Sequence, residues 1–213
     1  MKNQEVLEEL IERYPKLEEC REAIASAFEI MVESYENNHK MLIAGNGGSA
    51  ADSNHIVGEL MKSFELKRPI EKDIYNKIVK HEKYGKMLAD SLQGTLPAIS
   101  LNNHESLNTA FLNDVNPYVT FAQQVLGYGQ KEDVFLGIST SGNSKNVVMA
   151  AIVAKAKGMK VIGLTGTKES DLSAIADVTI KVPETRTFKI QEYHLPVYHC
   201  LCLMLEKYFF SNK

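Results

Sequence analysis

The sequence predicts an α/β protein, with a doubly wound, five-stranded parallel sheet between two layers of helices and further helices at the N-terminus. Five short apolar runs are each followed by a polar loop and then by apolar residues at helical spacing. Strands that alternate with helices imply crossover connections, and therefore parallel strands. A chain of 213 residues with 44% hydrophobic residues can bury one core of this kind. The expected strands are residues 41–44, 98–101, 134–138, 160–164 and 178–182.

Residues 1–38 are expected to form helices that precede the first strand. Apolar residues recur every three or four positions from Leu17 to Tyr35, and more weakly over residues 2–13. Pro15 separates the two segments, because proline lacks the backbone donor that a helix interior needs. These helices should pack on the sheet or on another subunit.

Residues 69–96 read as an insertion before the second strand, rich in Lys and Glu and containing two short helices. Such a segment is a solvated helical face, a lid or a subunit contact. The last helix is expected over residues 188–210, bent at Pro196. Since no repeat, low-complexity tract or linker divides the chain, residues 1–213 are expected to form a single domain.

Composition restricts the partners and the location. A net charge of -3 argues against nucleic acid and against a polybasic membrane surface. The N-terminus lacks a signal-peptide pattern, and no apolar run reaches the roughly 18 residues of a membrane span, so we expect a cytoplasmic protein. The three cysteines, Cys20, Cys200 and Cys202, fit neither a disulfide framework nor a zinc motif and should be buried thiols.

A glycine-rich loop follows the first expected strand. Gly45, Gly47 and Ala50 match a dinucleotide-binding fingerprint, G-x-G-x-x-A. That fingerprint also needs a second strand ending in an acidic residue about 20 positions later, to hold the ribose. Here residues 64–69 occupy that place and are expected to continue a helix, so we predict no nucleotide cofactor.

A serine-rich loop, "GISTSGNSKNV", follows the third strand and opens a helix. It carries Ser139, Thr140, Ser141 and Ser144 around Gly142. Hydroxyl groups and free backbone N–H groups at a helix N-terminus favour an anion, here a phosphate. The alternative is a serine-rich turn with a helix cap.

The two loops should meet over one crevice, because both follow the carboxyl ends of strands in a doubly wound sheet. The glycines would let backbone donors approach hydroxyl groups, while Asn46 and Ser49 add polar side chains. A phosphate loop beside such a loop suggests a phosphorylated sugar or polyol.

Two helices carry candidate reactive side chains. His55 and Glu59 share one face of the helix that begins near Ala50, while Gln191 and His199 share a face of the last helix. If the pairs converge, they could bind a transition metal, or Glu59 and His199 could be a general base and acid. His55 and Glu59 could equally be an ordinary surface pair.

Several motifs in order carry a family resemblance: "GNGGSAADSNHIVGEL", "GISTSGNSKNV", "GMKVIGLTG", "ADVTIKVP" and "KIQEYHLPVYH". The chain resembles the sugar isomerase (SIS) domain family and is closest to the phosphoheptose isomerases. The resemblance extends from the N-terminal helices to Phe210, apart from the insertion. It implies the SIS fold with flavodoxin-like strand order, and a homotetramer with active sites at subunit interfaces.

The resemblance also implies roles for individual residues. The implied phosphate ligands are Ser139, Thr140, Ser141 and Ser144, and the implied sugar contacts are Asn46, Gly47, Ser49 and Gln191. The implied catalytic pair is Glu59 and His199. Where family members bind zinc, one ion per site, the ligands match His55, Glu59, Gln191 and His199.

The implied reaction interconverts a ketose phosphate and an aldose phosphate, as with sedoheptulose 7-phosphate, by acid-base proton transfer through an enediol. Two departures make another sugar phosphate credible, for example a precursor of cell-surface polysaccharide. About 27 residues follow Arg68-Pro69 where the family runs directly into a strand, and the next loop, "LNNHESLNTAFLND", is atypical. The alternative function is a non-catalytic SIS module that binds a sugar phosphate as a sensor or serves as a scaffold.

Overall fold

The computed structural model describes residues 2–211 and contains one five-stranded parallel sheet. The strands are β1 (Met41–Ala44), β2 (Ala98–Ser100), β3 (Val134–Ile138), β4 (Lys160–Gly166) and β5 (Val178–Val182), in the order β2-β1-β3-β4-β5. This confirms the predicted α/β fold and its flavodoxin-like strand order. Ala44 pairs with Gly137, so β1 and β3 end side by side where the direction of winding reverses.

The helices before the insertion are α1 (Lys2–Arg13), a 3₁₀ helix η1 (Pro15–Cys20), α2 (Arg21–Glu36) and α3 (Gly48–Met61). The remaining helices are α4 (Lys72–Ile78) and α5 (Gly85–Ser91) in the insertion, followed by η2 (Leu101–Asn103), α6 (Glu105–Asp114), α7 (Thr120–Tyr128), α8 (Lys145–Ala156), α9 (Asp171–Ile175) and α10 (Thr187–Phe210). As expected, α10 contains Pro196. Among the described residues, no helix has the length and apolar character needed to cross a membrane.

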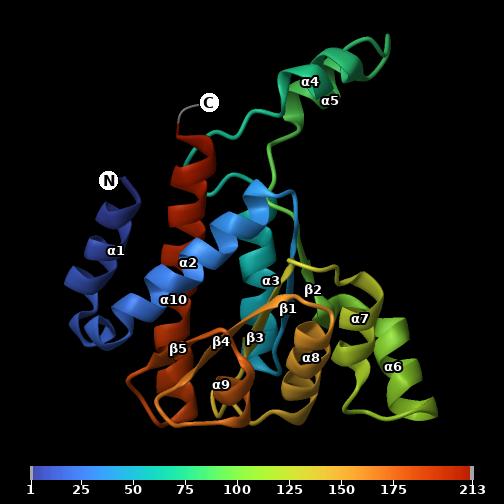
Figure 1. Cartoon of the computed structure of the whole chain (residues 1–213). Helices are drawn as coiled ribbons and strands as arrows, with labels where there is room; N and C mark the ends of the chain where they lie inside the picture. Colours follow the sequence, from blue (N-terminus) through green and yellow to red (C-terminus); the bar gives the residue numbers. More distant parts are fainter. Residues whose placement is uncertain (1, 212–213) are drawn as a thin grey trace.

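Helices cover both faces of the sheet (Figure 1), and an apolar core lies on each face. On one face, α2, α3 and α10 cover the sheet, and α1 packs on α10 from outside. On the other face, α7, α8 and α9 bury residues such as Phe135 and Leu172. Every residue of β1 and β3 is buried, because helices cover both faces. The three cysteines are buried free thiols, as predicted.

The sequence-based expectation for residues 64–69 was wrong. Helix α3 ends at Met61, and the residues that follow form a non-helical loop. The backbone N–H groups of Phe64, Glu65 and Leu66 donate to the carboxylate of Glu206, 2.7–3.0 Å away on α10. These N–H groups donate to a carboxylate that is remote in sequence instead of to helical carbonyls. The helix therefore does not continue. The loop still provides no second strand of a dinucleotide fold.

The residues after β2, which were expected to form a loop, also differ from the expectation, because they form two helices. Leu101 opens η2 instead of ending the strand, and α6 follows. The Ser100 hydroxyl accepts from the Asn102 N–H and caps η2. Helix α6 buries none of its residues, so it lacks the strong apolar stripe by which a helix is recognised in sequence.

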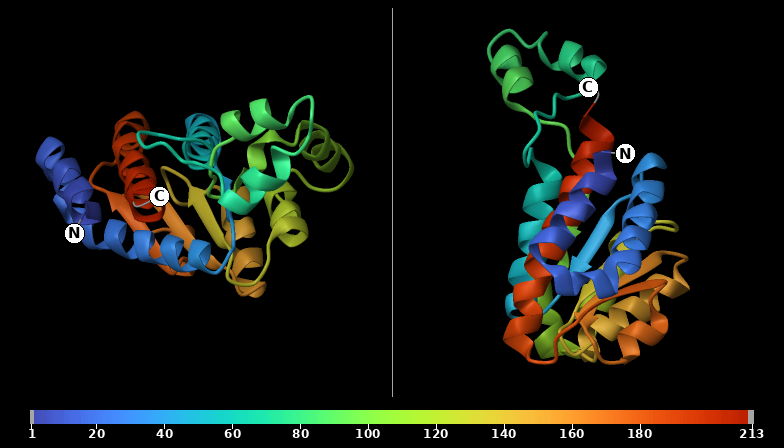
Figure 2. Two further views of the ribbon diagram at one scale, coloured as in Figure 1. Left: turned by 90° about the horizontal axis from the view of Figure 1, so that it is seen from above. Right: turned by 90° about the vertical axis from the view of Figure 1, so that its left-hand side faces the viewer.

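The inserted segment forms a helical hairpin, α4 and α5, that projects from the body (Figures 1 and 2). A bridge between Pro69 and Gln93 closes its base, where the Gly94 N–H also donates to the Arg68 carbonyl at 2.7 Å. The two helices contact each other, and Ile74 and Met87 stay exposed.

We expect the rest of the protein to fold without this hairpin, because the chain segments that enter and leave it already pair at its base. Replacing residues 71–92 by a short Gly-Ser linker should change the melting temperature by less than about 4 °C, the equivalent of about 1 kcal/mol in a domain of this size. Calorimetry of the variant and the full chain measures this. A drop of 10 °C or more, with loss of cooperative unfolding, would show that the hairpin is part of the folding unit.

Candidate functional site

The loop after β1 turns sharply into α3. At Gly45, a Cβ would lie 2.5 Å from the carbonyl oxygen of Ser49, and Gly47 has a φ of 55°. Both positions therefore require glycine. Ser49 is buried, whereas Asn46 and Gly47 are exposed at the N-terminus of α3.

The loop after β3 gathers hydroxyl groups at the N-terminus of α8. The Oγ atoms of Ser139 and Ser144 lie 2.9 Å apart, and Thr140 and Ser141 lie between them in the chain. Ser144 is the N-cap residue, but its hydroxyl makes no capping hydrogen bond. The helix cap of the alternative is therefore absent at Ser144, although the Ser141 hydroxyl accepts from the Asn143 N–H at 3.2 Å, as in a serine turn. Gly142 has a φ of 67°, and a Cβ there would collide with Ser170.

A pair of amides joins the two loops. Asn46 Nδ2 donates to Asn146 Oδ1 at 2.9 Å, and Asn146 Nδ2 donates back to Asn46 Oδ1 at 2.9 Å. Asn102 Nδ2 also donates to the Gly45 carbonyl at 2.7 Å. The structure thus brings both loops to one place, as expected. Asn146 did not stand out in the sequence as a site residue, although it lies in the first turn of the helix that the serine loop opens.

Helices α3 and α10 bring three reactive side chains together. His55 Nε2 lies 3.3 Å from Glu59 Oε1, and the rings of His55 and His199 meet edge to face with centroids 5.0 Å apart. The second Glu59 oxygen lies 3.4 Å from Lys62 Nζ. The Glu59 side chain is only 11% exposed, whereas that of His55 is 43% exposed. The pair on α3 is therefore part of a cluster that includes His199, which lies 140 or more positions away in the sequence.

The environment of His199 favours its neutral form. Burial lowers the pKa of its imidazole, and the charge of neighbouring His55 acts in the same direction, while Glu59 opposes both. Its Nε2 is buried and has no hydrogen-bond partner in the part of the chain that is described. A neutral imidazole with an unused nitrogen can exchange a proton with a bound molecule near neutral pH.

Gln191 lies apart from this cluster. Its side-chain nitrogen would be 2.5 Å from a Cβ on Gly48, so the Gln191 amide packs against the start of α3 beside the glycine loop. Eight residues of helix, about 12 Å, separate it from His199. This position suits contact with a sugar more than contact with the His55 cluster.

The side chains do not form a metal site as they stand. Between residues 2 and 211, no group of three or more His, Cys, Asp or Glu side chains is arranged to hold a metal ion. The donor types of His55, Glu59 and His199 suit zinc, but Gln191 is two turns away along α10. The four predicted ligands therefore do not converge on one point in the described residues, and zinc binding by them stays a prediction.

A second set of side chains orients His55. The Tyr198 hydroxyl lies 2.9 Å from His55 Nδ1 and donates to Asp52 Oδ1 at 3.3 Å. Burial raises the pKa of Asp52, and its other oxygen is buried without a partner in the described chain. Because Tyr198 engages Nδ1, the ring directs Nε2 toward Glu59. Tyr198 was not predicted, since it looks like one more apolar position of the last helix.

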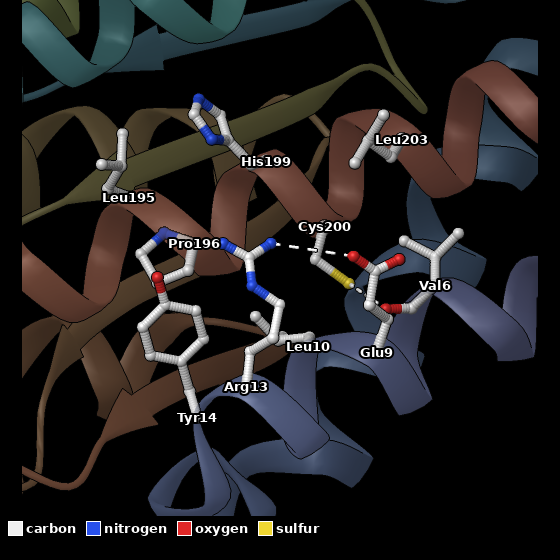
Figure 3. A pocket seen from close by; sticks show the side chains of 10 residues that line it. All are labelled: Val6, Glu9, Leu10, Arg13, Tyr14, Leu195, Pro196, His199, Cys200 and Leu203. Atoms are coloured by element: carbon white, nitrogen blue, oxygen red, sulfur yellow. Dashed lines mark hydrogen bonds and ion pairs between the residues drawn. The ribbon is translucent and has the colours of Figure 1, made fainter. Parts of the chain in front are cut away.

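Helix α1 covers the other side of α10 from this cluster (Figure 3). A pocket of about 160 Å³ lies between the two helices, with Arg13, Tyr14 and Leu195 among its lining residues. His199 borders this pocket, but its ring points away from α1. The N-terminal helices therefore support the helix that carries His199.

The parallel sheet, with its glycine and serine loops at the point where the winding reverses, defines a SIS-domain protein. A family model described as "SIS domain" matches residues 5–93 and 88–166. The phosphoheptose isomerase of Aromatoleum aromaticum is 40% identical over 189 residues, which cover 87% of this chain and 83% of that protein. That of Helicobacter pylori is 37% identical, covering 91% and 88%. The chain belongs to the phosphoheptose isomerase family.

Solved structures agree with this assignment. The structure of phosphoheptose isomerase from Neisseria gonorrhoeae matches with a TM-score of 0.74 and 32% identity, covering 94% of each chain. A phosphoheptose isomerase from Francisella tularensis matches with a TM-score of 0.73 and 29% identity, covering 97% of each. The similarity thus extends over nearly the whole fold.

Proposed function

We propose that this protein isomerises a phosphorylated sugar between its ketose and aldose forms, with sedoheptulose 7-phosphate as the expected substrate. Membership of the phosphoheptose isomerase family supports the reaction class. The observation that carries the proposal is the contact of the His55–Glu59 pair with His199, since a binding module needs no such pairing of acid and base.

The serine loop is the proposed phosphate site. Ser139, Thr140, Ser141 and Ser144 present hydroxyl groups at the N-terminus of α8, where the helix dipole favours an anion. Asn46, Gly47, Ser49 and Gln191 are the proposed contacts to the sugar hydroxyls, because they surround the start of α3.

The Glu59 carboxylate is the proposed base. It takes a proton from C1 of the ketose while the C2 carbonyl oxygen gains one, which produces an enediol. Glu59 then returns its proton to C2 as the C1 hydroxyl loses its own, and the aldose results. Neutral His199 is suited to give and take the protons on oxygen, since burial disfavours its charged form.

Solvent exchange tests this proposal. The protein is incubated in deuterated water with sedoheptulose 7-phosphate and a panel of other ketose phosphates, and products are examined by NMR. Deuterium at the carbon beside the carbonyl, together with aldose formation, is the expected result. If no sugar exchanges while phosphosugars still bind, the enzyme proposal fails and the sensor or scaffold alternative replaces it.

The Ser144→Ala substitution should weaken phosphosugar binding. Loss of one hydrogen bond to a charged group costs about 1.5–3 kcal/mol, equivalent to an increase in KM of roughly 10- to 100-fold. Calorimetric titration with inorganic phosphate measures the same loss without turnover. Ser34→Ala is the matched control, because its hydroxyl binds the Glu132 carbonyl far from the serine loop. An unchanged KM in Ser144→Ala would contradict the proposed phosphate site.

We also propose a homotetramer in the cytoplasm with active sites at subunit interfaces. The family resemblance and the exposure of His55 support it, since a neighbouring subunit would be needed to enclose that side chain. Light scattering measures the assembly. Zinc binding by His55, Glu59, Gln191 and His199 stays a prediction, and metal analysis of the purified protein tests it.

A further inference from the structure

We propose that a buried ion pair, Arg68–Glu206, positions Glu59 and His199 for proton transfer. This inference rests on the proposed isomerase function and assigns it two positioning residues. Arg68 Nε lies 2.7 Å from Glu206 Oε1, and the two side chains are 0% and 1% exposed. Neither residue stood out in the sequence as part of a site.

Arg68 holds the end of the helix that carries Glu59. Its Nη1 donates to the Leu60 carbonyl at 2.8 Å, and its Nη2 donates to the carbonyl of Glu59 itself at 2.9 Å. Both carbonyls belong to the last turn of α3, where backbone acceptors lack helical partners. The guanidinium supplies those partners and its charge suits a helix C-terminus, so the backbone of Glu59 is fixed at the turn most prone to fray.

Glu206 holds the loop that packs on His199. Its two oxygens accept three consecutive backbone N–H groups, from Phe64 to Leu66, in addition to Arg68. The Phe64 ring meets the His199 imidazole edge to face, with centroids 5.4 Å apart. Glu206 itself lies on α10, seven residues and about two turns beyond His199, so it shares that helix face.

One carboxylate thus connects both members of the proposed catalytic pair. Through Arg68 it fixes the main chain of Glu59, and through Phe64 it contacts the ring of His199. Burial alone would raise the pKa of Glu206, but the loop N–H groups and Arg68 outweigh burial and keep it ionised. Because removing one partner of a buried ion pair is strongly destabilising, the pair also stabilises the fold, and the test must separate this structural role from positioning.

The matched variants are Arg68→Lys and Glu206→Gln. Lys keeps the charge but lacks the planar fork of donors that reaches Glu206 and both carbonyls together, and Gln keeps one acceptor oxygen. We expect each to lower kcat about 10- to 100-fold, while KM and the Kd for inorganic phosphate change by less than about threefold, because the serine loop is untouched. Phe64→Leu is a third variant that leaves the ion pair intact, and it should lower kcat by a smaller factor.

Asp133→Asn is the control for a purely structural effect. Asp133 is fully buried directly before β3 and paired with Lys40 Nζ at 2.6 Å. The hydrogen bonds and ion pairs given for its side chain go to His39, Lys40 and Gln130, and none of them goes to α3 or α10. This variant should lower the melting temperature but leave kcat per folded molecule unchanged.

Two outcomes separate the inference from the proposed function. If the wild type turns over its sugar phosphate while Arg68→Lys, Glu206→Gln and Phe64→Leu match Asp133→Asn in kcat, the positioning role is overturned alone. If the wild type itself isomerises no sugar phosphate, the proposed function is overturned and this role falls with it. A selective loss of kcat at constant phosphate affinity supports both.

Discussion

Replacing Glu59 by Gln is expected to reduce kcat by about 10²- to 10⁴-fold, the usual contribution of a positioned acid or base. Gln keeps the size of the side chain and one acceptor oxygen, so His55 and Lys62 retain a neighbour. It cannot take a proton from carbon, however. Solvent deuterium exchange into the sugar should therefore disappear together with turnover, while phosphosugar affinity changes little.

Glu65→Gln is the matched control for this experiment. Glu65 lies six residues later on the loop after α3, is exposed, and makes its structural contact through its backbone N–H. Its variant should keep full activity. Retention of more than about a tenth of wild-type turnover in Glu59→Gln would rule out this carboxylate as the base. His199→Ala should also lose exchange and turnover if His199 handles the protons on oxygen.

Stability against unfolding should fall as the pH drops from about 6.5 toward 4, because of His194. This residue is fully buried on α10, where Nε2 lies 3.3 Å from the Thr165 carbonyl. Burial lowers the pKa of its imidazole to about 4, against 6.5 for an exposed histidine. Between these values the unfolded chain binds a proton that the native protein does not, so acid favours unfolding.

The size of this effect follows from the two pKa values. Their difference, 6.5 minus about 4, corresponds at about 1.4 kcal/mol per pH unit to a loss of roughly 3.5 kcal/mol. The contribution is complete above pH 6.5 and is lost as the pH falls through this window. Urea unfolding at pH 7.5 and at pH 5 measures the part lost between pH 6.5 and 5, about 2 kcal/mol.

The His194→Gln variant isolates this contribution. Its amide can still donate to the Thr165 carbonyl but does not titrate, so it should lose less stability than the wild type between the two pH values. Exposed His81 on the hairpin supplies the control, and His81→Gln should behave like the wild type. Equal acid sensitivity in all three proteins would show that His194 does not titrate in this way.

The sequence alone determined the sheet and the two loops. Strands β1, β3 and β5 begin and end where their apolar runs do, because each is a short buried strand bounded by polar residues. The serine loop is equally local, since the hydroxyl groups and the helix start that favour a phosphate lie within six residues. The order of motifs along the chain also sufficed to indicate the family.

Only the tertiary structure decided how the reactive side chains are held. The end of α3 at Met61, the Arg68–Glu206 pair and the contact of Tyr198 with His55 join residues more than 130 positions apart. The contact of Gln191 with the start of α3, rather than with His55, likewise follows from the parallel packing of α3 and α10. Periodicity and propensity report which face of an element is apolar. They do not report which remote polar group satisfies a buried carbonyl or an imidazole nitrogen, and here those partners hold the site.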